Sequence, residues 1–266
     1  SYKPISNQCF QIFVIYLDPH YLERLQAATR KFWEKPALNN IGGETFTYEQ
    51  MARTIAHFHV LFENSGIKKG DKIALCAQNG ARWGFAYLAV NTYETIIVPI
   101  LADFKPDSVM GLVNHSDSIA LFTDSDKWSK MDIAKMPKVR FVLDINTLQL
   151  LFCNDKKVSK AFENLDKLFD KKYPDGFGPD DVVYPTDNWD DLSTINYTSG
   201  STGDPKGVML TYRNFSATVD YSQRFMPAGD KIISMLPMAH MYGLVIEYLY
   251  PICNGTSIYW LGKAPT

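Results

Sequence analysis

A run of twelve residues from Tyr197 to Val208, YTSGSTGDPKGV, is rich in glycine and in small hydroxyl side chains and contains one lysine. Glycine lets the backbone approach an anion closely and point amide N–H groups at it. The hydroxyl groups add hydrogen-bond donors, and the ammonium group of Lys206 supplies a positive charge suited to a polyphosphate. We therefore predict a phosphate-binding loop, with Gly207 at its end and with binding residues Thr198, Ser199, Gly200, Ser201, Thr202, Gly203 and Lys206.

This predicted loop differs from the P-loop of ordinary nucleoside triphosphatases. The P-loop places a Gly-Lys pair, followed by Ser or Thr, after four intervening residues. Here Pro205 precedes Lys206 and Gly207 follows it. Taken one residue type at a time, such a segment indicates only a flexible connection. The complete string is far more specific, so we retain the phosphate-binding interpretation.

His240 is the second candidate for chemistry. A lone histidine is usually structural. His240, however, lies in the string LPMAHMYG, after an expected strand and before an apolar helix. Open α/β sheets bind ligands in such positions, at the ends of parallel strands. His57 and His59 are weaker candidates, because residues two apart on a helix diverge and cannot share a metal ion.

The elements that must position these residues alternate along the chain. Strands are expected at 72–77, 95–101, 118–123, 139–144, 192–197, 231–236 and 256–261, and two short ones within 37–48. One helix begins at a capping box of Thr47 and Gln50 and ends at Gly66, and another begins at Pro106. Further helices are expected through 22–28 and 83–90 and over 212–225 and 242–252. Apolar strands that alternate with amphipathic helices predict an α/β fold of mostly parallel sheets with helices on both faces.

A change of composition between residues 154 and 191 is the candidate domain boundary. This stretch is rich in Lys, Asp, Pro and Gly and predicts a long connection with one helix around Phe162, Leu165 and Leu168. We therefore expect an N-terminal α/β subdomain over residues 1–185. Residues 186–266 would begin a second subdomain, which carries the phosphate-binding loop.

The composition limits the class of protein. With 46% hydrophobic and 21% charged residues, the chain is typical of a globular protein, and its net charge of −2 favours no nucleic-acid partner. The apolar run 10–17 is too short to span a membrane. The four cysteines lie far apart among apolar neighbours, which favours reduced thiols and a cytoplasmic location.

Several segments resemble the adenylate-forming superfamily, which contains acyl-CoA synthetases, luciferases and peptide-synthetase adenylation domains. The string YTSGSTGDPKGV matches the phosphate-loop signature of that family, and LPMAHMYG resembles its next motif. Upstream, TFTYEQMA, GIKKGDKIALCAQNGARW and IIVP resemble its early region, with Asn79, Trp83 and Pro99 at matching positions. The chain departs from the family pattern at Tyr212, where the family often has His, and at Tyr93 and Glu94, where the family has a small glycine step.

The resemblance implies an acid–thiol ligase that makes an acyl-adenylate from ATP and then transfers the acyl group to CoA. The string LPMAHMYG resembles the fatty-acid branch best, so fatty acid, ATP and CoA would be the substrates. Lys206 would neutralise phosphate charge, and Thr198 would help coordinate Mg²⁺. His240 would lie by the substrate carboxylate and the acyl or CoA channel, with Tyr242 and Gly243 in the pocket wall.

Other interpretations stay open. The family's later motifs do not occur in these 266 residues, so we expect an incomplete N-terminal portion of the enzyme fold that is inactive in ligation by itself. Another adenylating enzyme, acting on aryl or amino acids, would share the same motifs. A non-catalytic nucleotide-binding module would also share them. The sequence leaves open a peripheral association with a membrane and a homodimer.

Overall fold

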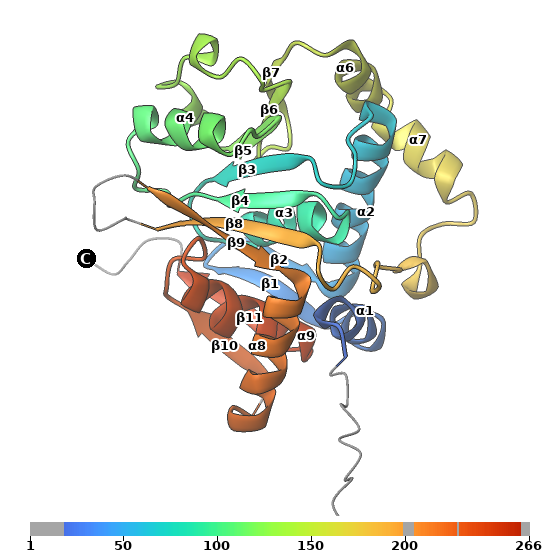
Figure 1. Ribbon diagram of the computed structural model, residues 1–266. Coiled ribbons are helices and arrows are strands. Elements are labelled where there is room, and N and C mark those ends of the chain that lie inside the picture. Colours follow the sequence, from blue (N-terminus) through green and yellow to red (C-terminus); the bar gives the residue numbers. More distant parts are fainter. Residues whose placement is uncertain (1–18, 199–204, 228, 262–266) are drawn as a thin grey trace, which may run out of the picture.

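Two β-sheets form the centre of the computed structural model, which describes residues 19–198, 205–227 and 229–261 (Figure 1). Among the described residues, the larger sheet has seven strands in the order β7-β6-β5-β3-β4-β8-β9. The strands are β3 (Lys72–Cys76), β4 (Ile96–Pro99), β5 (Ala120–Thr123), β6 (Phe141–Asp144), β7 (Leu150–Cys153), β8 (Leu192–Thr198) and β9 (Lys206–Thr211). The inner strands are parallel to one another, whereas β7 and β9 pair antiparallel at the two edges.

The smaller sheet joins segments from both ends of the described chain. Its order is β10-β11-β1-β2, with β10 (Lys231–Ser234), β11 (Ser257–Leu261), β1 (Pro36–Ile41) and β2 (Thr45–Thr47). The strands β10, β11 and β1 run parallel, and β2 pairs antiparallel with β1. The expected mostly parallel α/β architecture is therefore confirmed.

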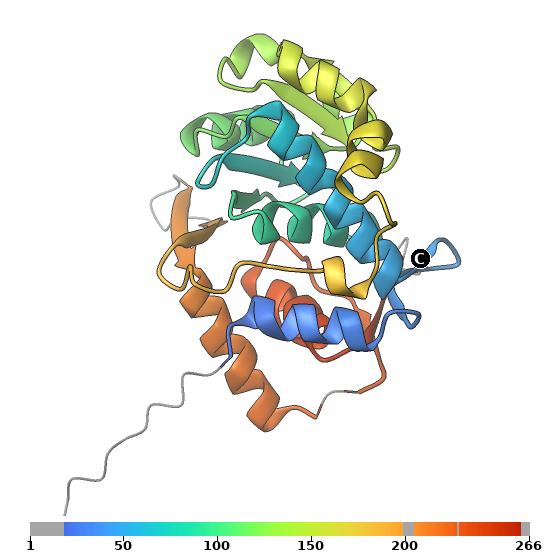
Figure 2. The ribbon, with the colours of Figure 1, turned by 90° about the vertical axis from the view of Figure 1, so that its right-hand side faces the viewer.

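Helices cover both faces of the larger sheet. The α-helices of the described chain are α1 (Tyr21–Lys31), α2 (Tyr48–Ser65), α3 (Ala81–Thr92), α4 (Pro106–His115), α5 (Ser125–Trp128), α6 (Lys156–Glu163), α7 (Leu165–Lys172), α8 (Tyr212–Phe225) and α9 (Tyr250–Cys253). On β3, Ala74 packs in the apolar cluster of α4, while Ile73 and Leu75 pack in the cluster of α2 and α3. The strand is thus buried on both faces, as its continuous apolar sequence requires. Figure 2 faces the side of α1, α2 and α7.

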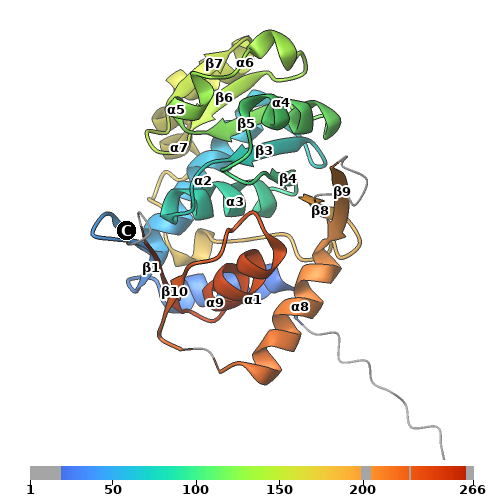
Figure 3. The ribbon, with the colours of Figure 1, turned by 90° about the vertical axis from the view of Figure 1, so that its left-hand side faces the viewer.

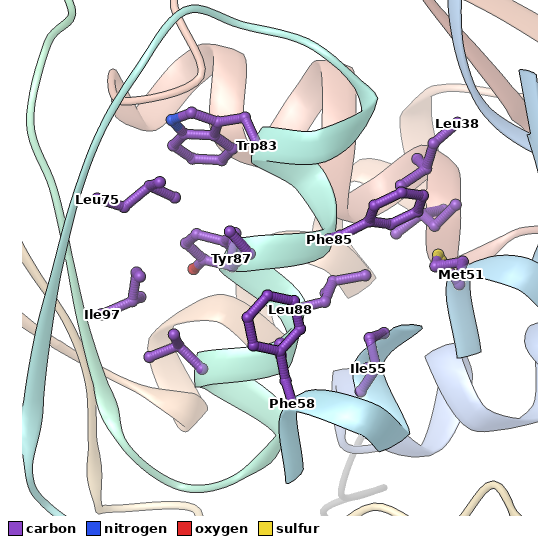
Figure 4. Close-up of a cluster of buried hydrophobic side chains, with 14 of the residues drawn as sticks. Leu38, Met51, Ile55, Phe58, Leu75, Trp83, Phe85, Tyr87, Leu88 and Ile97 are labelled. Carbon is purple, nitrogen blue, oxygen red and sulfur yellow. The ribbon is translucent and has the colours of Figure 1, made fainter. Parts of the chain in front are cut away.

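Helix α3 lies between the two sheets. Figure 4 shows Leu75 and Ile97 of the larger sheet on one side of it and Leu38 of β1 on the other. The aromatic residues Trp83 and Tyr87 of α3 are buried and stack with their ring centroids 5.5 Å apart. One continuous core therefore connects the two sheets.

The local signals at the ends of helices were accurate. The Thr47 hydroxyl accepts from the Gln50 backbone N–H, and the Gln50 side chain accepts from the Thr47 N–H, as a capping box requires. Gly66 ends α2 in the left-handed conformation, at φ 68°. The helix expected over 242–252 differs, because residues Gly243–Leu249 are π-helical and α9 follows. Pro251 lacks the N–H that an α-helical bond to residue 247 needs.

Three further differences concern strands and the long connection. The sequence indicated neither β7 nor β9, and the connection holds two helices, α6 and α7, where one was expected. Strand pairing also does not follow the expected division after residue 185, because β8 and β9 join the sheet of β3 to β7 while β1 and β2 join β10 and β11. The division into subdomains stays a prediction. No helix in the described part of the chain is long and apolar enough to cross a membrane.

Candidate functional site

The hairpin of β8 and β9 carries the two described residues of the predicted polyphosphate site. Thr198 ends β8 and is the direct partner of Lys206, which begins β9. Residues directly opposite each other on antiparallel strands project their side chains to the same face. Five predicted binding residues lie outside the described residues and stay predictions: Ser199, Gly200, Ser201, Thr202 and Gly203.

Both Thr198 and Lys206 are exposed to solvent. Within the described parts of the chain, no carboxylate lies within 4 Å of the Lys206 ammonium group. The described residues therefore leave its positive charge without a carboxylate partner. A lysine whose charge is not neutralised by the protein is suited to a polyphosphate.

Gly207 has a packing role that the sequence did not indicate. A Cβ atom at this position would lie 2.9 Å from Ile195 Cγ2 and 3.3 Å from Tyr197 Cε1. The backbone of β9 thus lies directly against two side chains of β8. The expected role of Gly207, close approach to a phosphate, stays a prediction, and the structure shows a close approach between the two strands at this residue.

The turn that carries His240 is held by asparagine side chains from two other elements. Asn79, which follows β3, donates from Nδ2 to the Leu236 carbonyl over 2.8 Å, and its Oδ1 accepts from the Met238 N–H over 3.1 Å. Asn196 on β8 donates from Nδ2 to the buried Ala239 carbonyl over 2.8 Å. Asn79 therefore joins the segment after β3 to the turn after β10. Asn196 joins the same turn to β8, two residues before Thr198.

A carboxylate also braces this turn. Glu247 Oε2 accepts from the backbone N–H groups of Met235 and Leu236, over 2.8 and 2.9 Å, and from the Ser234 hydroxyl over 3.0 Å. The sequence analysis did not single out Glu247 or Asn196. A charged residue inside an otherwise apolar segment, GLVIEYL, was the available signal for Glu247.

His240 and Tyr242 are both exposed, and the Tyr242 backbone N–H donates to His240 Nδ1 over 3.4 Å. Gly243 packs tightly, since a Cβ there would lie 2.5 Å from the Pro237 carbonyl oxygen. Among the described residues, no hydrogen bond joins His240 to Thr198 or Lys206. The structure brings the His240 turn to β8 through Asn196, not through direct contact of the predicted catalytic side chains.

A pocket of about 880 Å³ lies between α4 and the hairpin, which share one side of the molecule in Figure 3. Its lining includes Phe104, Ser108, His115, Tyr197, Thr198 and Pro205. The Tyr197 hydroxyl and His115 Nδ1 lie 2.7 Å apart, within hydrogen-bond distance. In the described ranges, no cluster of three or more His, Cys, Asp or Glu side chains could hold a metal ion.

The fold and the hairpin define an adenylate-forming type of domain, and comparison with known families agrees. The chain belongs to the AMP-binding enzyme family, whose model matches residues 25–266. It is 29% identical over 220 residues to a probable acyl-activating enzyme 16, chloroplastic, of Arabidopsis thaliana, and that match covers 79% of this chain and 30% of the relative. It is 26% identical to the long-chain-fatty-acid–CoA ligase 5 of Rattus norvegicus, covering 79% of this chain and 32% of the relative.

Solved structures share the fold. A long-chain-fatty-acid–CoA ligase from Archaeoglobus fulgidus has a TM-score of 0.71 at 19% identity, over 91% of this chain and 46% of that one. An anthranilate–CoA ligase in complex with anthranoyl-AMP has a TM-score of 0.75 at 16% identity, over 93% of this chain and 45% of that one. The chain spans about a third of the length of the curated relatives it matches.

Proposed function

We propose that the protein is the N-terminal portion of an acid–thiol ligase that activates a fatty acid with ATP and transfers the acyl group to CoA. The observation that carries the proposal is the paired, exposed Thr198 and Lys206 on adjacent strands. Membership of the AMP-binding enzyme family and similarity to long-chain fatty-acid ligases support it.

The chemistry requires charge stabilisation. A substrate carboxylate attacks the α-phosphorus of ATP, the bond to the bridging oxygen breaks, and pyrophosphate leaves with the negative charge. Lys206 would hold that charge at the β- and γ-phosphates, and the Thr198 hydroxyl would orient the same group. Thr198 would help hold Mg²⁺ at the phosphates, since this ion prefers oxygen ligands and keeps several waters. His240 would lie at the carboxylate, on the turn that Asn196 ties to β8.

The second step consumes the acyl-adenylate. The CoA thiol, as thiolate, attacks the acyl carbon, and AMP leaves with the electron pair of the mixed-anhydride bond. Acyl-carrier protein, in place of CoA, is a second candidate for the acceptor of the acyl group, because the chain is also 26% identical to a long-chain-fatty-acid–[acyl-carrier-protein] ligase of Arabidopsis thaliana.

A cytoplasmic, reducing location is also part of the proposal. Buried Cys76 and Cys253 are free thiols, and burial raises the pKa of each to about 12.

The test is ATP–pyrophosphate exchange by the full-length protein with fatty acid present. Lys206→Ala should lower the exchange rate by about a hundredfold, the usual effect of removing one group that stabilises a transition state. Lys68→Ala, at an exposed lysine in the turn before β3, should leave the rate unchanged and serves as the control. An exchange rate for Lys206→Ala equal to that of Lys68→Ala would contradict the assignment.

A further inference from the structure

The tip of β8 extends beyond its pairing with the inner sheet. The pairing of β8 with β4 consists of Ile97 and Thr194, while pairing with β9 continues to Thr198. Backbone pairing of the last three described residues of β8, 196–198, is therefore with the edge strand β9 alone. Edge strands are the most weakly restrained part of a sheet. Side-chain contacts are therefore a second means of fixing the position of Thr198 and Lys206, beside their pairing with each other.

Asn196 and Tyr197 of β8 supply such contacts. They do so on opposite faces of the sheet, because successive side chains on a strand alternate. Asn196 binds the Ala239 carbonyl on the face of the His240 turn. Tyr197 points to the other face, where its hydroxyl lies 2.7 Å from His115 Nδ1. The two rings are 5.6 Å apart and meet edge to face, at 73°.

The Tyr197 ring also contacts the second strand of the hairpin. Tyr197 is the direct partner of Gly207, and a Cβ atom at Gly207 would lie 3.3 Å from Tyr197 Cε1. His115 is the last residue of α4, which is anchored in the core by buried Val109, Leu112 and Val113. One side chain thus joins both strands of the hairpin to a fixed helix.

We propose that Tyr197 is a positioning residue for the polyphosphate site, with His115 as its anchor on α4. The pair holds the ends of the hairpin at Thr198 and Lys206 in a fixed position relative to α4, so that both groups meet one phosphate chain together. This inference rests on the proposed function of the hairpin. Both residues act through Thr198 and Lys206, whose positions they fix.

The test uses conservative variants and two measurements on the same protein. Tyr197→Phe keeps the ring against Gly207 and removes the hydroxyl. His115→Ala removes the anchor, whereas His115→Asn keeps a polar atom near the position of Nδ1. Hydrogen exchange of the backbone amides of β9 reports on the hairpin without any ligand, and calorimetry reports on the binding of MgATP.

We expect Tyr197→Phe and His115→Ala each to speed exchange in β9 and to weaken MgATP binding by about fivefold, the effect of one hydrogen bond. The double variant should be no weaker than either single variant, since both remove the same contact. His115→Asn should restore most of the binding.

Faster exchange with unchanged ATP binding would overturn the positioning role, because the contact would then be structural only. If Tyr197→Phe leaves the hydrogen exchange of the β9 amides unchanged, the contact between Tyr197 and His115 does not anchor the hairpin. If the unmodified protein binds neither MgATP nor pyrophosphate, the proposed function of the hairpin fails, while the exchange rates still decide whether the pair holds the hairpin.

Discussion

Gly243 is the residue at which the His240 turn meets the π-helical segment, and its backbone lies against the turn itself. A Cβ there would lie 2.5 Å from the Pro237 carbonyl oxygen, a contact that side chains cannot relieve because the oxygen belongs to the backbone. The sequence indicated Gly243 only as part of a pocket wall. The structure adds a steric reason for glycine at this position.

Gly243→Ala should therefore lower the free energy of unfolding by about 1–3 kcal/mol, the range for overpacking at a site that cannot adjust freely. Urea denaturation measures the change. Gly111→Ala is the matched control, because a Cβ at Gly111 in α4 meets no atom within 4 Å and alanine favours the helix. Equal stabilities for the two variants would show that the turn moves without strain.

His20 makes the stability of the protein depend on pH. It is 1% exposed, and its Nδ1 accepts from the Leu22 backbone N–H over 3.1 Å at the start of α1. Burial lowers the pKa of His20 from 6.5 to about 4. Between these values the unfolded chain binds a proton that the folded chain does not, so stability falls as the pH falls from 6.5 towards 4.

The full loss from His20 is roughly 3 kcal/mol, of which about 2 kcal/mol is already lost at pH 5. His20→Asn keeps a side chain that can cap α1 and removes the titrating group. Urea denaturation at pH 7 and pH 5 should show the larger loss in the unmodified protein. The same loss in both proteins would assign the pH dependence to other groups.

Among single residues, the sequence was most informative where local spacing carries the chemistry. Thr198 and Lys206 were predicted from one short string, and the structure pairs them on adjacent strands. Asn196 and Glu247 were not singled out, because their partners are backbone groups of a turn that the sequence places elsewhere. A hydrogen bond between Asn196 and Ala239 has no signature in either segment alone.

At the scale of elements, the strand β8 and the His240 turn depend on that hydrogen bond. Asn196→Ala would leave the buried Ala239 carbonyl without its side-chain donor, which costs about 1–3 kcal/mol of unfolding free energy. Asn114→Ala is the control, since Asn114 makes a comparable bond to the Lys135 carbonyl on the exposed surface and its loss should cost less. Urea denaturation of the two variants should separate them, and equal losses would contradict the role of Asn196.

The elements themselves were predictable to different degrees. Inner strands such as β3 are buried on both faces and show as continuous apolar runs, and α2 is bounded by its own capping residues. The strands that the sequence did not indicate, β7 and β9, lie at the two edges of the sheet. Edge strands are only partly buried, as the exposed Lys206, Val208 and Met209 of β9 illustrate. The sequence of β9, KGVMLT, therefore carries a weak hydrophobic pattern, whereas β7, LLFC, is a short apolar run that periodicity alone does not identify as a strand.

At the scale of the whole molecule, the two sheets are assembled from segments that alternate along the chain. Leu38 on β1 pairs with Ile258 on β11, although most of the chain separates them. Such pairings join distant segments that each look like ordinary strands, so no local pattern predicts them. The change of composition after residue 154 marks the connection from β7 to β8 within the larger sheet, whereas the chain crosses between the two sheets elsewhere, from β2 to β3 and from β9 to β10.

The proposed function depends on the β8–β9 hairpin being a receptor for a phosphate chain. Calorimetric titration of the 266-residue chain with magnesium pyrophosphate and with MgATP tests it most directly. We predict that both ligands bind and that Lys206→Ala weakens binding at least about tenfold, as the loss of a charge-assisted hydrogen bond should. No binding of either ligand, or equal binding by the Lys206→Ala variant, would contradict the account.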